Sequence, residues 1–196
     1  MKFSDVNIKT VVKYYQFTAG MNIDADGSPH AYHPDPAKGL DYLANAGSPG
    51  NWYGLVTDKA GKPVLQPNGY YISTTSLVDK TKAITDPTRY VNAEVIPYIV
   101  LPAGRFNAAL GDFVVCAYNG NLVGGIYADV GGRNVIGEAS IAMASALGIN
   151  ADPKRGGVTS VVTYYVFPGT SVGFISDVNA IQEKAIELFK TLVGEQ

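Results

Sequence analysis

The sequence is poor in the residues that form disulfides, thiolate metal sites and imidazole-based catalytic sites. Its 196 residues include one cysteine and two histidines. A single cysteine excludes an intrachain disulfide and argues against a metal site made of thiolates. Cys116 stands among apolar neighbours in GDFVVCAYNG, so we expect a buried core residue, as free cysteines usually are. A nucleophilic role would need a base, and only His30 and His33 offer an imidazole.

Charged side chains are also scarce, at 16% of the chain against about 25% in an average soluble domain. Lysine and arginine number 15 against 17 acidic residues, which gives a net charge of −2 with no basic block. The electrostatic footprint of a nucleic-acid-binding protein is therefore missing. No apolar window is long enough to span a membrane, and MKFSDVNIKTVVKYY contains no signal-peptide core. We expect neither nucleic acid nor membrane among the partners.

Glycine, proline and tyrosine are abundant, with 22, 11 and 13 copies, which is typical of a fold with many turns. Strand patterns occur in Ile96–Leu101 and GVTSVVTYYVFPGT, and TVVKYYQF indicates a strand or a short helix. An Asn-Gly turn separates two strands in GDFVVCAYNGNLVGGIYADVG, and the run 51–77 predicts a further hairpin. With no repeat or linker, the chain is predicted to form a single domain over residues 1–196, mainly β (α+β) and closed into a barrel.

Helical patterns are few and are expected at the periphery of the barrel. A short helix is predicted over residues 40–47. The Ala-rich run GEASIAMASALGI predicts a second helix, with Glu138 near its start and Gly148 after its last turn. The strongest pattern predicts a C-terminal amphipathic helix over about 177–193, capped by Asp177.

Two acids stand out in a run that is otherwise apolar, small or glycine. Asp129 ends a strand pattern and is followed by two glycines, while Glu138 comes just before the Ala-rich run. A negative charge at a helix start is favoured by about 0.3–1 kcal/mol, which would explain Glu138 without any catalysis. Glycosidic bond cleavage, however, needs a pair of carboxyl groups facing one cleft. Their separation is roughly 6.5–9.5 Å for inversion and about 5–5.5 Å for retention.

A second acid cluster lies in NIDADGSPHAYH. Asp24 and Asp26 precede a glycine as in a calcium-binding loop, but the third acid and the bidentate glutamate of an EF-hand are missing. The alternatives are an ordinary Asp-Gly turn and a binding site for ammonium or guanidinium groups. Tyr32 and Trp52 are candidate sugar-binding aromatics, and Tyr53 is another; core packing explains the only tryptophan equally well.

Seven sequence blocks resemble, in order, the fungal-type chitosanases of glycoside hydrolase family 75. The resemblance covers about Asn22 to Gly173 and rests on these blocks: IDADGSPHAYHPD, GLDYLANAG, GYYISTTSL, YVNAEVIPYIVLP, GDFVVCAYNGNLVGGIYADVG, IGEASIAMASALGI and FPGT. The strand, turn and Ala-rich helix are also similar to the core of double-psi β-barrels. The resemblance implies an endo-acting hydrolase of β-1,4-linked glucosamine polymer (chitosan) that inverts the anomeric centre.

The resemblance also implies roles for individual residues. Asp129 matches the catalytic aspartate and Glu138 the catalytic glutamate. By analogy with other double-psi barrels we expect Asp129 to be the general acid and Glu138 the general base, although exchanging them fits the sequence equally well. Asp24 and Asp26 are expected to bind protonated glucosamine amines. Hydrolysis by two carboxylates needs no cofactor, and we expect no metal.

Two features depart from the family pattern. Family members are typically secreted, whereas no leader is present in the chain, so the compartment is left unassigned. The loop VGGRNVI between the two acids is shorter than in fungal members. We expect a monomer acting on a polysaccharide. Two other functions stay open: a hydrolase of peptidoglycan or another amino-sugar glycan on the same barrel, and a non-catalytic carbohydrate-binding module.

Overall fold

The computed structural model describes residues 1–11 and 13–194, which form a mostly β protein with two α-helices in this part of the chain. Short 3₁₀ turns lie at Phe3–Asp5, Leu43–Ala46 and Pro87–Arg89. The helices are α1 (Ile141–Leu147) and α2 (Val178–Leu192). The strands are β1 (Ile8–Val11), β2 (Tyr14–Asp24), β3 (Gly47–Ser48), β4 (Asn51–Trp52), β5 (Tyr98–Pro102), β6 (Phe113–Tyr118), β7 (Asn121–Gly131), β8 (Glu138–Ser140) and β9 (Val158–Val166).

Six of the described strands close into a barrel. Their order is β2-β8-β5-β7-β6-β9, and β9 pairs back onto β2, while β1 pairs with β2 outside the ring. β2–β8 and β5–β7 are parallel, and the other ring pairings are antiparallel. Closure leaves no unpaired edge among the ring strands, which removes a site for aggregation. The predicted mainly β barrel is confirmed, and its double-psi form stays a prediction.

The barrel interior is apolar and holds the single cysteine. Cys116 packs with Phe17, Ile99 and Tyr164, and the prediction that it is a core residue is confirmed. Burial raises the pKa of its thiol, which disfavours the reactive thiolate. Met143 of α1 belongs to the same cluster.

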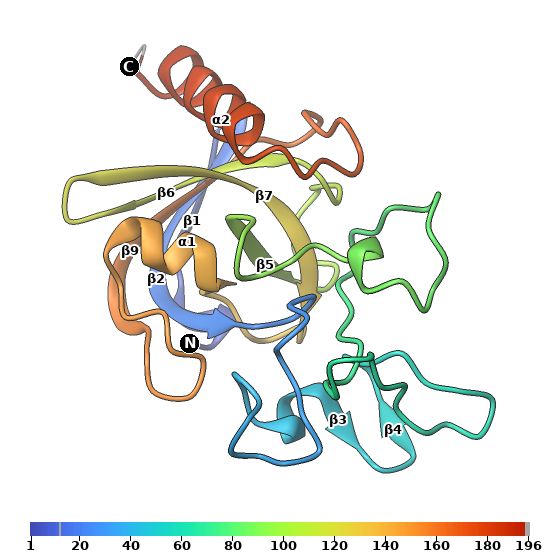
Figure 1. Cartoon of the computed structure of the whole chain (residues 1–196). Coiled ribbons are helices and arrows are strands. Elements are labelled where there is room, and N and C mark those ends of the chain that lie inside the picture. The colour runs from blue at the N-terminus through green and yellow to red at the C-terminus, as the bar shows by residue number, and fades with distance from the viewer. Residues whose placement is uncertain (12, 195–196) are drawn as a thin grey trace.

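The C-terminal helix covers the outer face of the barrel. Figure 1 shows α2 lying across β6 and β7. As predicted, Asp177 caps the helix by accepting hydrogen bonds from the backbone N–H groups of residues 179 and 180. Ile181 and Ala185 are buried against the sheet. A Cβ at Gly124 would lie 2.8 Å from that of Ala185, so glycine permits the close approach of strand and helix.

The β6–β7 hairpin has the predicted Asn-Gly turn. Asn119 and Gly120 have φ of 49° and 85°, the positive pair that a type I′ turn requires. The predicted strand at Ile96–Leu101 is also confirmed as β5, which is buried along its whole length.

Three local predictions need correction. Glu138 does not begin a helix; it lies in β8, where Asn22 pairs with it on one side and Val100 on the other. The helix begins at Ile141, because the Ser140 hydroxyl caps it by accepting from the Met143 N–H at 3.1 Å. A helix-start explanation of the Glu138 charge is therefore wrong.

The other two corrections concern short elements outside the barrel. The helix predicted over 40–47 is only the 3₁₀ turn Leu43–Ala46, although Gly47 ends it with φ 121°. The hairpin predicted over 51–77 is reduced to β4 paired with β3 and a series of isolated bridges: Leu55 with Ser73, Thr57 with Pro63, and Leu65 with Tyr71. Turns and prolines interrupt this run too often for a regular ladder.

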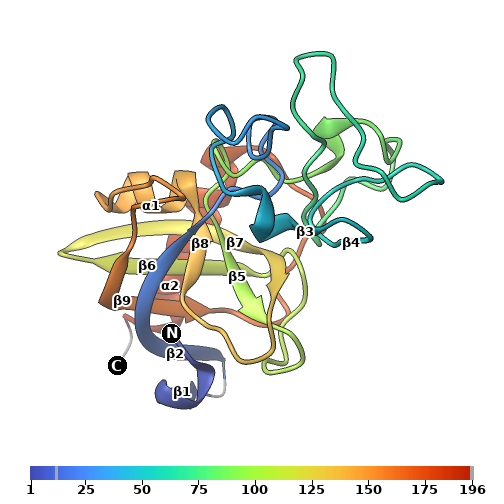
Figure 2. The same ribbon diagram turned by 90° about the horizontal axis from the view of Figure 1, so that it is seen from below.

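The long connection between β2 and β5 projects beyond the barrel, as Figures 1 and 2 show from two directions. It has small apolar clusters of its own, one around Tyr32 and Leu55 and another around Val56 and Tyr90. Within the described residues, neither helix has the length and apolar character needed to cross a bilayer. That residues 1–196 form one domain stays a prediction.

Candidate active site

Asp129 and Glu138 pair with the same residue of β5, one from each of the two strands that flank it. Val100 of β5 pairs with Asp129 of β7 in the parallel direction and with Glu138 of β8 in the antiparallel direction. Neighbouring strands are about 4.8 Å apart, so two spacings put the Cα atoms of the two acids roughly 9–10 Å apart. All three side chains line one cavity of about 630 Å³. The structure therefore brings both predicted catalytic acids to the same cavity.

The Asp129 carboxylate is held by one serine. Its Oδ1 accepts from the Ser76 backbone N–H at 2.7 Å and from the Ser76 hydroxyl at 2.5 Å. The same hydroxyl oxygen accepts from the Val130 N–H at 3.2 Å. Burial raises the pKa of Asp129, and the hydrogen bonds from Ser76 oppose that rise because they stabilise the charged form.

Glu138 has a different environment. Its side chain has no hydrogen-bond donor within the described part of the chain. Burial, then the nearby charge of Asp129, raises its pKa from 4.5 to about 7. Gly131 lies close to Val100, since a Cβ there would come within 2.9 Å of a methyl carbon of Val100, while Glu138 Oε2 would be at an ordinary contact distance of 3.6 Å. The group therefore holds a proton at mildly acidic pH.

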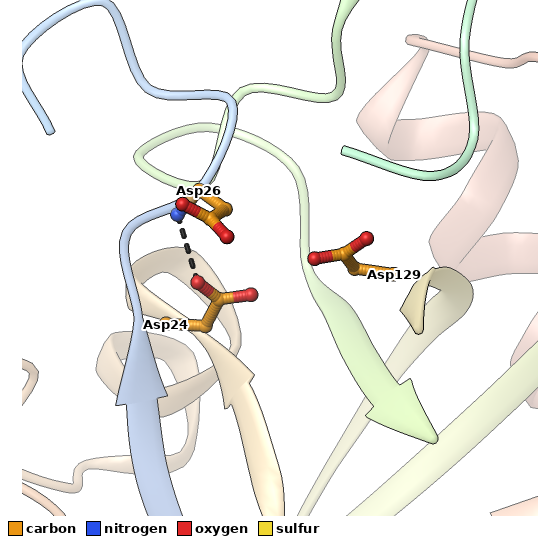
Figure 3. A group of neighbouring side chains, drawn as sticks. All are labelled: Asp24, Asp26 and Asp129. Atoms are coloured by element: carbon orange, nitrogen blue, oxygen red, sulfur yellow. Dashed lines mark hydrogen bonds between the residues drawn. The ribbon is translucent and has the colours of Figure 1, made fainter. Parts of the chain in front are cut away.

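Asp24 and Asp26 join the site from the end of β2. Figure 3 shows them beside each other, with Asp129 facing them from β7. One carboxylate oxygen of each of the three lies within 4.8 Å of the others, a spacing that suits an ammonium group or a hard cation. Asp24 accepts from the Asp26 N–H at 2.8 Å and from the Tyr98 hydroxyl at 3.0 Å.

Hydroxyl groups orient Asp26 in turn. Tyr32 donates to its Oδ1 at 2.8 Å and Ser73 donates to the same oxygen at 3.1 Å. Burial, and then repulsion between neighbouring carboxylates, raises the pKa values of Asp24 and Asp26 well above the ordinary range. An incoming cation would relieve that repulsion, so this corner of the site favours a positively charged ligand.

A second cavity of about 460 Å³ continues the first. The two cavities share five residues and so form one groove: Asp24, Asp26, Asn45, Tyr53 and Glu138. Lys154 is the one basic side chain that lines either cavity in the described structure, and its Nζ is bound to the backbone oxygens of Pro36 at 3.1 Å and Gly39 at 2.6 Å. The groove is therefore acidic.

A sequence comparison decides the family. The family sequence model described as fungal chitosanase of glycosyl hydrolase group 75 matches residues 21–195. The chain belongs to this family. Membership supports a chitosan-degrading glycoside hydrolase with a polysaccharide substrate. The match extends beyond the resemblance over 22–173 and includes all of α2. No curated protein sequence matches the chain.

The aromatic residues predicted to bind sugar differ in burial and in whether they line the groove. Tyr32 is buried, lines the second cavity, and presents its hydroxyl to Asp26. Trp52 is half-buried against the small cluster around Tyr32 and lines neither cavity of the groove. Tyr53 is 67% exposed and lines both cavities, so its ring is the accessible one. Sugar binding by these residues stays a prediction.

Sequence reasoning did not identify Ser76, Asp41 or Asn45. Asp41 is buried, and its carboxylate accepts from the Asn45 amide at 3.0 and 2.9 Å, which fixes Asn45 at the junction of the two cavities. Ser76 lies 53 residues before the acid that it contacts. No local signal in the sequence marks Ser76, because only the fold brings its partner close, whereas Asp41 and Asn45 are four residues apart and form a local contact that stands in no recognised motif. Neither His30 nor His33 lines the groove.

Proposed function

We propose that the protein is an endo-acting chitosanase that cleaves β-1,4 links between glucosamine units, with Asp129 and Glu138 as its two catalytic carboxyl groups. The observation that carries the proposal is their common pairing with Val100 on one acidic groove. An open groove accepts the middle of a polymer, which suits endo cleavage. We further propose a monomer formed by a single domain, residues 1–196.

The spacing of the pair supports inversion. Cα atoms roughly 9–10 Å apart across Val100 are compatible with the carboxyl separation of about 6.5–9.5 Å that leaves room for water. One carboxyl group would protonate the leaving oxygen while the other removes a proton from the attacking water. Water then enters on the face opposite the bond that breaks.

The surroundings of the two acids favour the reverse of the roles expected from sequence. Two donors from Ser76 stabilise an ionised Asp129, which suits a base. Glu138 lacks such donors, and its pKa of about 7 keeps the proton that a general acid must donate. We therefore assign the acid role to Glu138 and the base role to Asp129.

Asp24 and Asp26 are proposed to bind the ammonium group of a glucosamine unit. Burial and repulsion between neighbouring carboxylates raise their pKa values, so the site favours their protonated forms more than water does. A bound ammonium would favour their ionised forms, so binding and proton release are coupled. Tyr53 would stack on a sugar ring, while Tyr32 orients Asp26. Trp52 would support the loop that carries Tyr53.

The test compares polymers that differ in charge. Chitosan, fully acetylated chitin and peptidoglycan sacculi are each incubated with the protein, and new reducing ends and viscosity are followed. The proposal expects a rapid fall in viscosity with chitosan and little turnover of chitin. Soluble fragments from sacculi with chitosan untouched would establish the alternative substrate. Chitosan binding without new reducing ends would establish a non-catalytic module.

A further inference from the structure

Residues 73–79 form an arm that lies along the end of β7 and carries Ser76. The Leu77 N–H donates to the Ala128 carbonyl at 2.8 Å, which attaches the arm to the strand just before Asp129. Thr75 ties the arm on its other side, where its hydroxyl accepts from the Val91 N–H at 3.0 Å. Ser76 is therefore fixed between two anchored neighbours.

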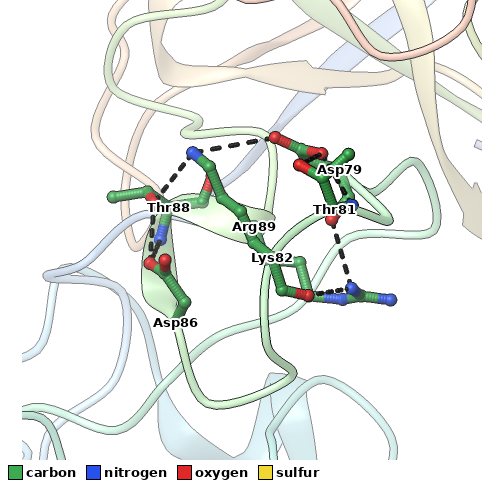
Figure 4. Close-up of polar contacts among 6 residues, drawn as sticks. All are labelled: Asp79, Thr81, Lys82, Asp86, Thr88 and Arg89. Atoms are coloured by element: carbon green, nitrogen blue, oxygen red, sulfur yellow. Dashed lines mark hydrogen bonds and ion pairs between the residues drawn. The ribbon is translucent and has the colours of Figure 1, made fainter.

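The arm continues into a loop that is closed by its own polar contacts. Figure 4 shows this loop, residues 79–89, with Lys82 reaching Thr88. The lysine Nζ donates to the Thr88 carbonyl at 3.0 Å and to its hydroxyl at 2.9 Å. Arg89 returns to the Asp79 carbonyl at 3.1 Å, and the Asp79 N–H donates to the Arg89 carbonyl at 2.8 Å. The end of the arm is thus held without any contribution from substrate.

The Ser76 hydroxyl has one orientation available. Its oxygen accepts from the Val130 N–H at 3.2 Å, and its hydrogen points to Asp129 Oδ1 at 2.5 Å. The Ser76 N–H donates to the same oxygen. Both donors bind Oδ1, so Ser76 leaves Oδ2 of Asp129 without a donor of its own. That oxygen is the one left for an attacking water.

The other titratable groups around Asp129 offer no positive charge. Asp24 and Asp26 approach from the end of β2, Glu138 from β8, and the Tyr98 hydroxyl from β5. Tyr127 precedes Asp129 on β7. Each of these groups is neutral or negative, so the hydrogen bonds from Ser76, and after them the neighbouring Val130 N–H, are the contacts that favour an ionised Asp129 over a protonated one.

From this geometry we propose that Ser76 is a positioning residue that keeps Asp129 ionised and directs its free oxygen into the groove as the catalytic base. The inference rests on the proposed function, and it adds the residue that prepares the base. In the proposed step, water gives its proton to Asp129 Oδ2 as the water oxygen bonds to the anomeric carbon. The bond to the leaving oxygen breaks, and that oxygen takes the Glu138 proton.

The experiment compares Ser76→Ala with Ser76→Thr, which restores a hydroxyl, and with Ser4→Ala as a control on an exposed serine. The pH dependence of kcat/KM is measured on a chitosan hexamer. Loss of the hydroxyl donor raises the pKa of the base, so the acidic limb moves up by about one pH unit in Ser76→Ala. KM and the thermal midpoint change little, and Ser76→Thr returns the limb toward the wild-type position.

A second measurement does not depend on turnover. The ¹³C resonance of the Asp129 carboxyl is titrated by NMR in wild type and Ser76→Ala, and the same upward shift in its midpoint is expected. An unchanged Asp129 midpoint overturns the inference, as does movement of the basic limb alone, which would make Asp129 the acid. Absence of chitosan cleavage by the wild type refutes the proposed function separately, and the NMR titration still decides whether Ser76 keeps Asp129 ionised.

Discussion

Asp129 and Glu138 are both partners of Val100, so a single residue of β5 sets the distance between them. The register shifts by one residue between Ile99 and Val100 on the β7 side, and this irregularity places Asp129 opposite Val100. Because side chains alternate along a strand, a slip of one residue would direct an acid away from the groove. The barrel therefore fixes the catalytic spacing through backbone pairing, with no contact between the two carboxyl groups required.

The proposed roles predict that variants of Glu138 and Asp129 respond differently when the substrate carries a better leaving group. Glu138→Gln should cleave chitosan poorly but retain most of its activity on a dinitrophenyl glycoside of a glucosamine oligomer, because that leaving group needs no proton. Asp129→Asn should be slow on both substrates, because it lacks the base. Steady-state rates on the two substrates measure this directly.

Azide provides the complementary test of the base. Asp129→Ala should recover activity with azide and yield a glycosyl azide of inverted configuration, since a small anion can take the place of activated water. Glu138→Ala should show no such product. The reverse pattern would restore the assignment expected from sequence, with Asp129 as the acid.

Burial of Glu138 predicts a pH-dependent cost in stability. Its pKa is about 7 in the folded protein against an ordinary value of 4.5, so the folded state holds its proton more tightly than the unfolded state. The contribution of protonated Glu138 to the free energy of unfolding is therefore complete below about pH 4.5 and is lost as the pH rises through about 7. Glu138→Gln cannot ionise, so at pH 8 it should exceed wild type in unfolding free energy by on the order of 3 kcal/mol.

Thermal or urea unfolding at pH 4 and pH 8 measures this difference, with Glu187→Gln on the exposed face of α2 as the matched control. The Glu138→Gln difference should vanish at pH 4, where wild type is protonated in both states. Equal stabilities of wild type and Glu138→Gln at both pH values would contradict the buried, donor-free environment described for this side chain.

Ligand binding should release protons from the acid cluster. Burial and neighbouring carboxylates raise the pKa values of Asp24 and Asp26, and a bound ammonium favours their charged forms. Calorimetric titration of Glu138→Gln with a chitosan hexamer near pH 6, in buffers of different ionisation enthalpy, should give a net proton release. Asp26→Asn should reduce that release and weaken binding, whereas a matched chitin hexamer should cause none. Identical apparent enthalpies in all buffers would exclude the coupling.

Tyr53 is expected to bind sugar through its ring. It is 67% exposed and lines both cavities, so truncation removes accessible aromatic surface without opening the core. Tyr53→Ala should raise KM for chitosan oligomers by about tenfold, in line with a loss near 1.4 kcal/mol. Tyr53→Phe should keep the wild-type KM, and Tyr42→Ala, another exposed tyrosine, is the control. An unchanged KM in Tyr53→Ala would remove this residue from the site.

Local chemistry made much of the fold predictable from the sequence. The Asn119–Gly120 turn, the cap at Asp177 and the apolar strand ending at Leu101 each depend on residues that are neighbours in the chain. Glu138 was harder to place, because Glu-Ala-Ser has no strand preference of its own. Pairing with β2 and β5 holds this short segment in the barrel, so tertiary contacts override local propensity.

The residues of the candidate site also divide into those that the sequence alone indicates and those that only the fold reveals. Asp24, Asp26, Asp129 and Glu138 could be selected because acids are unusual in apolar, glycine-rich runs. Ser76 could not, since a serine in ISTTSL carries no distinguishing pattern and its partner is 53 residues away. The acid and base roles also depend on such distant contacts, which is why sequence alone left them exchangeable.

The central claim is that the carboxyl groups of Asp129 and Glu138 carry out chitosan hydrolysis. The most direct test is kcat/KM on a chitosan hexamer for Asp129→Asn and Glu138→Gln, beside the control variants Asp5→Asn and Glu187→Gln on the exposed surface. We predict losses of about a thousandfold for each site variant and wild-type values for both controls. Wild-type turnover by either Asp129→Asn or Glu138→Gln would contradict the account.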